Sequence, residues 1–509
     1  MDLQVLLQIS VFCVSLFLFF KKAPFLQRRR SCSASTGKLP PGPAGLPIIG
    51  NLHQLGSQPH QTLARMAKLH GHLFTLQLGS ITTVVSSSPE TAHQILHKYD
   101  QAFSNRPVRD AVASQPDVEG TLAWVPGDHR WRNRRRICTT QMFSPQRLDF
   151  LQHLRHEKVG HLVAHIRKAA AAGAAVDVGQ LAFATSLNLI SRTIFSIDVV
   201  DSAFESAGEF KELVWRIMEI SGQPNLSDYF PVLRWLDVQG MRQRIQPSFR
   251  RMHEIFDGII GERVKARDAD RANRKGDFLD VLLDQCQEQG SDLNVRTIKP
   301  LILDLFIAGS DTSAITTEWA MAELLRKPET LQNARKELID TIGTDRSVLE
   351  SDIERLPYLQ AVVKETMRLH PAAPLLLPYI AGNDVEVCGF TIPKGSQVLV
   401  NAWAIARDPS CWKDPTSFCP ERFLDSSLDY KGHDFEYIPF GAGRRICPGL
   451  PLGVRMVNLE LASLIHSFHW ELPKGTTPES LDMQEQFGIT LKKAVPLSAI
   501  PSVRVGSHC

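Results

Sequence analysis

PFGAGRRICPGL, residues 439–450, places three glycines, two arginines and two prolines around one cysteine, Cys447. A cysteine that only fills a core position needs neither flexible glycines nor adjacent positive charge. Gly441 and Gly443 begin like the GxGxxG dinucleotide motif, but Ile446 stands where the third glycine is required. Covalent cofactor attachment through Cys-x-x-Cys-His would need a second cysteine, and the segment has none. The pattern therefore indicates a site built around the sulfur itself.

The whole chain has the composition of a large globular protein. It has 509 residues, of which 43% are hydrophobic and 22% are charged, and its formal net charge is +3. A balance this close to neutral points to no polyanionic partner. Nine cysteines, an odd number spread over the sequence, predict a reducing compartment with mostly unpaired thiols.

The first segment has the features of a membrane anchor. Residues 3–20 are almost entirely apolar, and a helix of that length spans about 27 Å, close to the thickness of a bilayer core. Asp2 precedes this run and five basic residues follow it within 21–30, the reverse of a cleaved signal peptide. We therefore expect residues 1–22 to be a single transmembrane helix, with the positive flank and the rest of the chain in the cytosol. The sequon at Asn225 should then stay unglycosylated.

The remainder of the chain is predicted to form one mainly helical domain with small β-sheets. Residues 23–39 form a basic linker, and four prolines within 40–47 predict a stiff, extended hinge at the start of a domain over 40–509. No repeat or internal linker divides that domain. Helices are predicted over 141–170, 207–220, 243–268, 297–326, 357–370 and 451–469, and strands within 73–79, 82–87 and 385–403.

The helix predicted over 297–326 is apolar almost all round, which is typical of a buried helix. Gly309, Ser310, Asp311, Thr312 and Ser313 interrupt its centre. Each buried polar group without a partner costs about 1–3 kcal/mol. The cluster therefore indicates either satisfied side chains at a bend or a widened turn where water or a ligand enters.

Two further motifs lie between this helix and the cysteine segment. Glu365 and Arg368 lie on one face of a predicted helix, which alone is a common salt bridge. Arg422 follows in a proline-punctuated loop. The cysteine segment then has the pattern Phe-x-x-Gly-x-Arg-x-Cys-x-Gly, with its fixed positions at Phe440, Gly443, Arg445, Cys447 and Gly449.

With these motifs in this order, the chain resembles a cytochrome P450, a haem-thiolate monooxygenase, over essentially its whole length. The resemblance implies that Cys447 is the axial ligand of the iron of haem b. It also implies that Asp311 and Thr312 are the pair that activates oxygen. The remaining positions that it carries over are a structural triad, Glu365, Arg368 and Arg422, and haem contacts at Trp131, Arg135, Tyr379, Phe440, Gly443 and Arg445.

The chemistry of a bound thiolate agrees with these assignments. The sulfur must be deprotonated and shielded, so positive charge and backbone N–H donors belong nearby. Gly443 and Gly449 are expected to allow close backbone approach and positive φ, and Arg445 to direct its charge at a haem propionate. Tyr379 departs from the basic residue expected at its position, because it can donate a hydrogen bond but brings no charge.

A basic stretch, HRWRNRRR at residues 129–136, allows two interpretations. Five arginines in seven residues could suggest a nucleic-acid patch. We instead expect Trp131 and Arg135, four residues apart on one helical face, to contact the haem propionates. The other face would then bind an acidic redox partner, and no nucleic-acid partner is expected.

The resemblance is greatest to the plant microsomal subgroup that includes hydroxylases of geraniol and related terpenoids. It implies hydroxylation of a small apolar terpenoid such as a monoterpene alcohol, with O2 and with electrons from NADPH through the membrane-bound cytochrome P450 reductase of the endoplasmic reticulum. The same chemistry on a phenolic, phenylpropanoid or flavonoid-type ring is an alternative. A haem carrier or non-oxygenating isomerase is a third possibility, but it would not need Asp311 and Thr312. Substrate contacts are expected at Phe306, Ala308, Leu375, Leu376, Leu377, Phe487 and Ile489.

Overall fold

The computed structural model describes residues 37–200, 207–270 and 274–504. The anchor predicted at residues 1–22 lies outside the described residues, as does nearly all of the linker. Within the described ranges, no helix combines the length and the apolar character that crossing a membrane requires.

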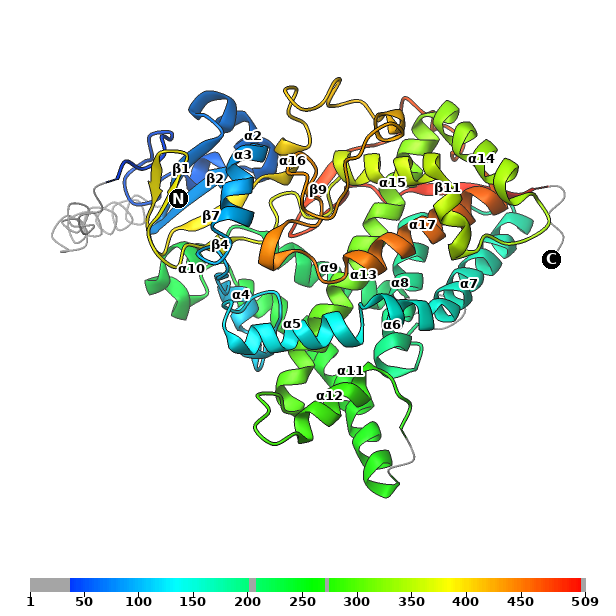
Figure 1. The fold of residues 1–509 in the computed structure, drawn as a ribbon, viewed down its shortest axis with the longest axis horizontal. Coiled ribbons are helices and arrows are strands. Elements are labelled where there is room, and N and C mark those ends of the chain that lie inside the picture. Colours follow the sequence, from blue (N-terminus) through cyan, green and yellow to red (C-terminus); the bar gives the residue numbers. More distant parts are fainter. Residues whose placement is uncertain (1–36, 201–206, 271–273, 505–509) are drawn as a thin grey trace, which may run out of the picture.

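Helices dominate the described chain (Figure 1). They are α2 (Pro59–His70), α3 (Pro89–His93), α4 (Asp110–Ala113), α5 (His129–Gln141), α6 (Pro145–Phe150), α7 (Gln152–Ala171), α8 (Val178–Phe195), α9 (Ala207–Gly222), α10 (Leu226–Tyr229), α11 (Met241–Ala269), α12 (Phe278–Gln287), α13 (Val295–Arg326), α14 (Pro328–Ile342), α15 (Pro357–Leu369), α16 (Ala402–Ile405) and α17 (Leu450–Ser467). Short 3₁₀ helices include η5 (Pro231–Leu236), η7 (Pro420–Phe423) and η8 (Gly443–Arg445), and η3 (Gln94–Lys98) is a π-helical turn.

The strands form small sheets, as predicted. The largest sheet has the order β1 (Leu73–Leu78), β2 (Ile81–Ser86), β7 (Gln397–Val400) and β4 (Tyr379–Ile380), with β2 and β7 parallel and the other pairs antiparallel. A three-stranded sheet has the order β3 (Val176–Asp177), β11 (Ser498–Val503) and β8 (Phe468–Glu471). In two further two-stranded sheets, β5 (Val385–Val387) pairs with β6 (Phe390–Ile392), and β9 (Glu485–Phe487) pairs with β10 (Leu491–Lys493). In Figure 1 the four-stranded sheet lies at one end of the molecule and the long helices fill the other.

Most predicted helix boundaries are accurate. The helices α9, α11, α13, α15 and α17 begin and end within two residues of the predicted positions. The helix predicted over 141–170 is wrong as a single element. The Ser144 side chain accepts a hydrogen bond from the backbone of Arg147, and Pro145 begins a new helix, α6, which α7 then follows. This cap and the following proline are the local signals that separate the two helices.

The central helix is α13, which packs against α8 and α17. It continues without interruption through Gly309–Ser313, and nearly every residue from Ser313 to Leu325 is buried. The Ser310, Thr312 and Ser313 hydroxyls donate to the carbonyls four residues earlier, at 2.7, 2.7 and 3.3 Å. The hydroxyls in the centre of the helix are therefore satisfied locally, and the helix ladder is not broken.

A buried acid, Glu460, joins the three central helices. It lies on α17 and accepts hydrogen bonds from Ser186 of α8 at 3.3 Å and from Thr317 of α13 at 2.9 Å. Burial raises the pKa of Glu460 to about 8, and the two hydroxyl donors only partly oppose this shift. Near neutral pH the folded protein therefore holds a proton that the unfolded chain releases.

Replacing Glu460 by Gln should make the protein less sensitive to alkaline pH. Because the folded pKa is raised, the contribution of Glu460 to stability is complete below the unfolded pKa near 4.5 and is lost as pH rises towards 8. The difference in unfolding free energy, Glu460→Gln minus wild type, should increase by up to about 1.4 kcal/mol per pH unit across this window. Urea unfolding at pH 5.5 and 7.5 measures it, and a constant difference would contradict the prediction.

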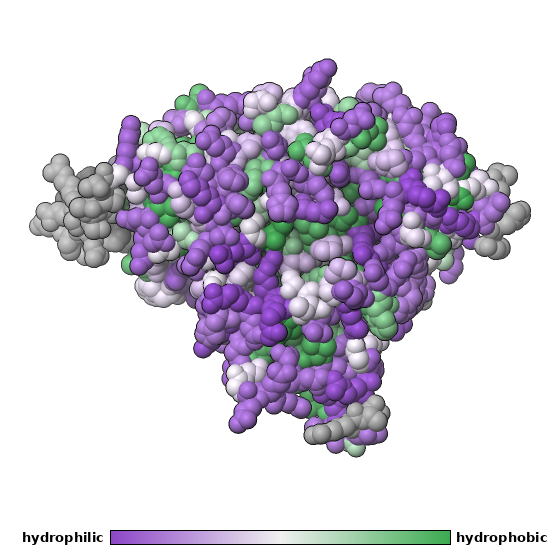
Figure 2. Space-filling view, in the orientation of Figure 1, coloured by the Kyte–Doolittle hydropathy of each residue, from purple (hydrophilic) through white to green (hydrophobic). Residues whose placement is uncertain are grey.

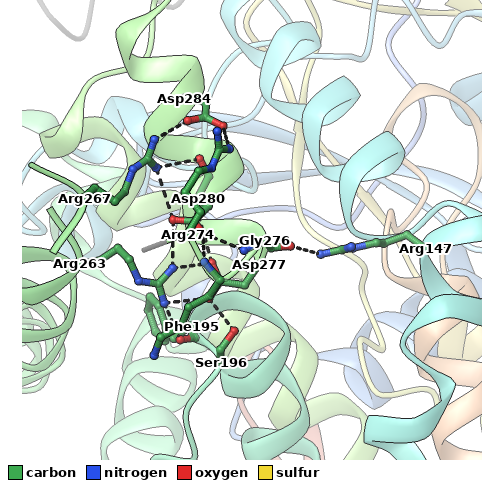
Figure 3. A network of polar contacts seen from close by, with 11 residues as sticks. Arg147, Phe195, Ser196, Arg263, Arg267, Arg274, Gly276, Asp277, Asp280 and Asp284 are labelled. Carbon is green, nitrogen blue, oxygen red and sulfur yellow. Dashed lines mark hydrogen bonds and ion pairs between the residues drawn. The ribbon is translucent and has the colours of Figure 1, made fainter. Parts of the chain in front are cut away.

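An ion-pair network fastens α12 to the end of α11 (Figure 3). Arg263 donates to both carboxylate oxygens of Asp277 at 2.7 and 2.8 Å and to the carbonyl of Phe195 at 2.9 Å. Asp280 contacts Arg263 at 3.1 Å and Arg267 at 3.4 Å. Since Arg263, Asp277 and Asp280 are buried, the pairing satisfies charges that would otherwise be costly.

Candidate active site

A cavity of about 340 Å³ lies beside the centre of α13. Its wall is formed by α13, the last turns of α9, α5, the loop before α5 and the cysteine segment. Most of the lining side chains are apolar, and its volume suits a small molecule. Cys447 and Thr312 both line this cavity, so the structure brings together the two motifs on which the predicted chemistry depends.

The cysteine segment is shaped by two glycines. Gly441 and Gly443 have φ of 71° and 64°, in the left-handed region that favours glycine. A Cβ atom at Gly443 would lie 1.7 Å from the carbonyl oxygen of Leu96, so no other residue fits this close contact with η3. The expectation of positive φ at Gly449 is wrong. Its φ is −84°, because it is the residue from which α17 begins.

The Cys447 sulfur lies where α17 begins. The backbone N–H of Cys447 donates to the carbonyl of Phe440 at 3.0 Å, and this hydrogen bond closes the loop. Burial raises the pKa of the Cys447 thiol, whereas the backbone N–H groups of Gly449 and Leu450 and the charge of Arg135 oppose the rise. These groups stabilise a thiolate, the form that binds iron.

The predicted triad is assembled behind this segment. Arg368 and Glu365 are fully buried and form a bidentate pair at 2.7 and 2.8 Å. The Arg422 Nε atom donates to Glu365 at 3.0 Å. Arg368 also donates to the carbonyls of Ala406 and Pro415, at 2.6 and 2.8 Å. The triad thus holds the long loop that leads from β7 to the cysteine segment.

Three guanidinium groups meet at the cavity wall near Cys447. Arg135 donates to the carbonyl of Ile446 at 2.6 Å, and the Cζ atoms of Arg135 and Arg445 lie 5.6 and 4.1 Å from the ring centre of Trp131. Burial and the charge of Arg106 lower the pKa of Arg445 to about 9. Within the described part of the chain, none of the three arginines pairs with a carboxylate. The wall therefore carries buried positive charge that calls for an anionic ligand.

Arg106 places a positive charge beside Tyr379, where the sequence lacks the expected basic residue. Its guanidinium stacks on the Tyr379 ring, with Cζ 4.0 Å from the ring centre, and donates to the carbonyls of Leu377 and Pro378. Its Nε atom is buried without a hydrogen-bond partner. A buried cysteine whose neighbours favour the thiolate, beside three arginines free of carboxylates, fits haem b, whose two propionates are carboxylates. The residues present therefore fit the predicted cofactor.

Asp311 and Thr312 point in different directions. The Thr312 side chain lines the cavity. Asp311 is turned away from it, and its Oδ2 atom accepts a hydrogen bond from Thr490 at 2.8 Å. Burial raises the pKa of Asp311 to about 6, and the bond from Thr490 limits the rise. Because Thr490 also lines the cavity, the acid is connected to it through one hydroxyl.

The predicted substrate contacts divide into three groups. Ala308, Leu376, Leu377 and Ile489 line the cavity, whereas Leu375 and Phe487 line a smaller neighbouring cavity that shares Leu376, Leu377 and Ile489 with the first. Phe306 lines neither and requires a correction. Its ring packs against Phe195 and Phe256 at centroid distances of 5.6 and 5.2 Å. Phe306 is fully buried on the side of α13 that packs against α8 and α11, and so it does not reach the cavity.

Several cavity residues were not found from the sequence. Asp304 of α13 accepts hydrogen bonds from the backbone of Leu122 and Ala123, at 2.7 and 2.9 Å, and so holds the cavity loop. Arg106 and Ser221 also belong to the wall. No motif marks these residues. The absence of a basic residue at 379 is the one sequence signal that another arginine lies beside this position.

Comparisons with known proteins agree with this geometry. The family description "Cytochrome P450" matches residues 40–497. Geraniol 8-hydroxylase of Swertia mussotii is 51% identical over 468 residues, covering 92% of this chain and 94% of the relative. Geraniol 8-hydroxylase of Catharanthus roseus is 49% identical over 502 residues, covering 99% and 100%. A solved structure of a zebra fish cytochrome P450 with progesterone has the same fold, with a TM-score of 0.75 at 24% identity, over 87% of this chain and 99% of that one.

Proposed function

The chain belongs to the cytochrome P450 family and is a monooxygenase, and from this premise we propose that it hydroxylates a small terpenoid such as a monoterpene alcohol. The observation that carries the proposal is the apolar cavity, which joins the Cys447 end, where the cofactor would bind, to the wall of α13 around Ala308 and Thr312, where a small apolar substrate would lie. Identity near 50% to two geraniol 8-hydroxylases over more than nine-tenths of the chain supports the substrate class.

The chain's own residues hold the cofactor and shape the reaction space. Cys447 would bind the haem iron, and Trp131, Arg135, Arg445 and Arg106 would hold the propionates. When bound, haem supplies the activation of O2 and the insertion of one oxygen atom into a C–H bond. The apolar wall excludes water and keeps the substrate against the centre of α13.

Protons reach the cavity through α13. The Thr312 hydroxyl donates to the carbonyl of Ala308 at 2.7 Å, and its free lone pairs can accept a hydrogen bond from water in the cavity. Asp311, with a pKa of about 6, exchanges protons readily near neutral pH. Thr490, bonded to Asp311 and lining the cavity, connects the carboxyl group to this space.

Replacing Thr312 by Ala should uncouple electron use from product formation. NADPH consumption in the presence of the reductase should continue, while the product formed per NADPH should fall by about 100-fold, the lower end of the range for loss of an acid–base group. Parallel measurement of NADPH oxidation and product by mass spectrometry tests this. Thr316→Ala is a matched control from the same wall, four residues along the helix. Unchanged coupling in Thr312→Ala would remove its proposed role.

Turnover with a substrate panel tests the substrate class. The reconstituted protein and reductase should hydroxylate terpene alcohols with a higher kcat/KM than phenolic or flavonoid-type compounds. A preference for the phenolic compounds would favour the alternative substrate class. Product formation without NADPH would instead indicate the isomerase alternative, because hydroxylation consumes two electrons.

We also propose attachment to the endoplasmic reticulum membrane. Hydrophilic residues predominate on the face in Figure 2, but exposed apolar side chains gather beside the turn between β1 and β2. The backbone of this turn bonds to Ile49 and to Tyr229, the last residue of α10, two positions before η5. The exposed residues on the two sides are Leu46, Ile48, Ile49, Val232, Trp235, Leu236 and Val238. Alkaline extraction of microsomes should leave the full chain in the membrane pellet, and its release would contradict the proposal.

A reductase would dock on the outer face of α5. Arg130, Arg132 and Arg136 are exposed, whereas Trp131 and Arg134 of the same helix are buried. A positive surface next to the cofactor site attracts an acidic electron donor. Changing the three exposed arginines to Glu should slow reduction by the reductase at least about tenfold at low salt, with substrate affinity unchanged. An unaltered rate would contradict this docking site.

A further inference from the structure

Ser221 carries an unsatisfied hydroxyl in the wall of the main cavity. It lies in the last turn of α9, its side chain is 98% buried, and its Oγ atom has no hydrogen-bond partner. A buried hydroxyl without a partner costs about 1–3 kcal/mol. Such a group in the wall of a substrate cavity points to a partner that comes with the substrate.

The other hydroxyls of the wall are already committed. Thr312, Ser313 and Thr316 donate to carbonyls of their own helix. The Tyr379 side chain is hydrogen-bonded with Arg106. Thr490 donates to Asp311 at 2.8 Å. Among the described residues that line this cavity, Ser221 is therefore the one with a buried hydroxyl that makes no protein hydrogen bond.

Ser221 lies at the end of the cavity that adjoins the smaller one. The next residue, Gly222, lines the smaller cavity, which no residue of the cysteine segment lines. A Cβ atom at Gly222 would lie 2.2 Å from the backbone of Gly488, so α9 is packed directly against the turn before Ile489. Arg109 fixes the carbonyl of Ser221 at 2.8 Å. The hydroxyl is thus presented from a rigid backbone, away from the Cys447 end.

We propose that the Ser221 hydroxyl binds a hydroxyl group of the substrate. The inference rests on the proposed function and narrows it. The substrate is a small alcohol, its hydroxyl is held at the α9 end of the cavity, and its hydrocarbon end extends towards Thr312 and the cofactor site. Oxidation then occurs at a carbon remote from the hydroxyl. A serine can both donate to and accept from an alcohol, so one contact satisfies both partners.

The opposing possibility is that the Ser221 hydroxyl forms a hydrogen bond only within α9 and does not contact the substrate. A serine in a helix can donate to the carbonyl four residues earlier, here Ile217, after a rotation of the side chain. The hydroxyl would then distinguish no ligands, and its removal would affect an alcohol and a hydrocarbon equally. This difference makes the proposal testable.

The test compares Ser221→Ala with wild type on matched ligands. Each pair contains an alcohol and the analogue in which hydrogen replaces the hydroxyl, and the pairs are geraniol with its hydrocarbon and a phenol of similar size with its arene. Dissociation constants come from substrate-induced difference spectra of the haem-loaded protein, and product positions come from mass spectrometry. Ser248→Ala is the matched control, because Ser248 is also buried with an unpartnered hydroxyl but lines neither cavity.

Ser221→Ala should weaken binding of the alcohol by about three- to tenfold and leave the hydrocarbon unchanged. It should also spread oxidation over more positions, whereas Ser248→Ala should change neither property. Equal effects on both members of a pair, or no effect on the alcohol, would overturn the inference while turnover of geraniol by wild type still supports the proposed function. If Ser221→Ala weakened binding of the phenol but not of geraniol, Ser221 would still be assigned to a substrate hydroxyl, but the proposed terpenoid substrate would be wrong. If the wild-type protein bound neither pair of ligands, both the Ser221 contact and the proposed function would be overturned.

Discussion

Arg368→Ala is expected to prevent stable folding of the cysteine segment and to abolish haem retention. The substitution leaves Glu365, which is fully buried, with only one charged partner, Arg422. Removing one member of a buried ion pair costs about 3–5 kcal/mol, a large part of the stability of a typical domain. It also leaves the carbonyls of Ala406 and Pro415 without their donor. The yield of haem-loaded protein and the urea midpoint are the measurements.

Two further variants keep this prediction specific to the buried charge. Arg422→Ala removes a more exposed partner with one bond to Glu365, so its cost should be at most about half as large. The double variant Glu365→Leu with Arg368→Met removes both buried charges and should recover part of the lost stability. If Arg368→Ala and Arg422→Ala proved equally mild, the triad would not be what holds the loop.

The features predicted correctly from the sequence are those that a compact motif encodes. The positive φ predicted at Gly443 is encoded within the cysteine segment, and Glu365 and Arg368, which form the predicted pair, lie one helical turn apart. The long helices were also recognised because their apolar pattern persists over many residues. Such features depend on local sequence and little on tertiary packing.

The features that were missed arise from tertiary contacts. Arg106 meets Tyr379 across more than 270 positions, and Ser221 meets the cavity only because α9 packs on the turn before Ile489. No periodic pattern marks either residue. Phe306 was misplaced because the apolar character of α13 continues around the helix, so the sequence does not show which side faces the core and which faces the cavity.

Cys447→Ser is expected to eliminate monooxygenation while leaving the fold intact. The serine is nearly the same size, and its N–H would still donate to the carbonyl of Phe440. An alcohol oxygen does not provide the electron-rich sulfur that favours O–O cleavage. Activity should therefore fall by at least about 100-fold, the upper end of the effect for residues that only orient metal ligands. The reduced spectrum with carbon monoxide should lose the band characteristic of a thiolate ligand.

The size of this loss follows from what surrounds the sulfur. Burial raises the pKa of Cys447, and the N–H groups of Gly449 and Leu450 with the charge of Arg135 oppose the rise, so the segment is arranged to hold a thiolate. A serine hydroxyl, with a far higher pKa, gains too little from the same groups to ionise. Cys138→Ser is the matched control, because that cysteine is buried nearby on α5 and lies outside the cavity wall. An unaltered carbon monoxide spectrum in Cys447→Ser would refute the assignment of the iron ligand, whereas the same spectral loss in Cys138→Ser would show that the effect is structural.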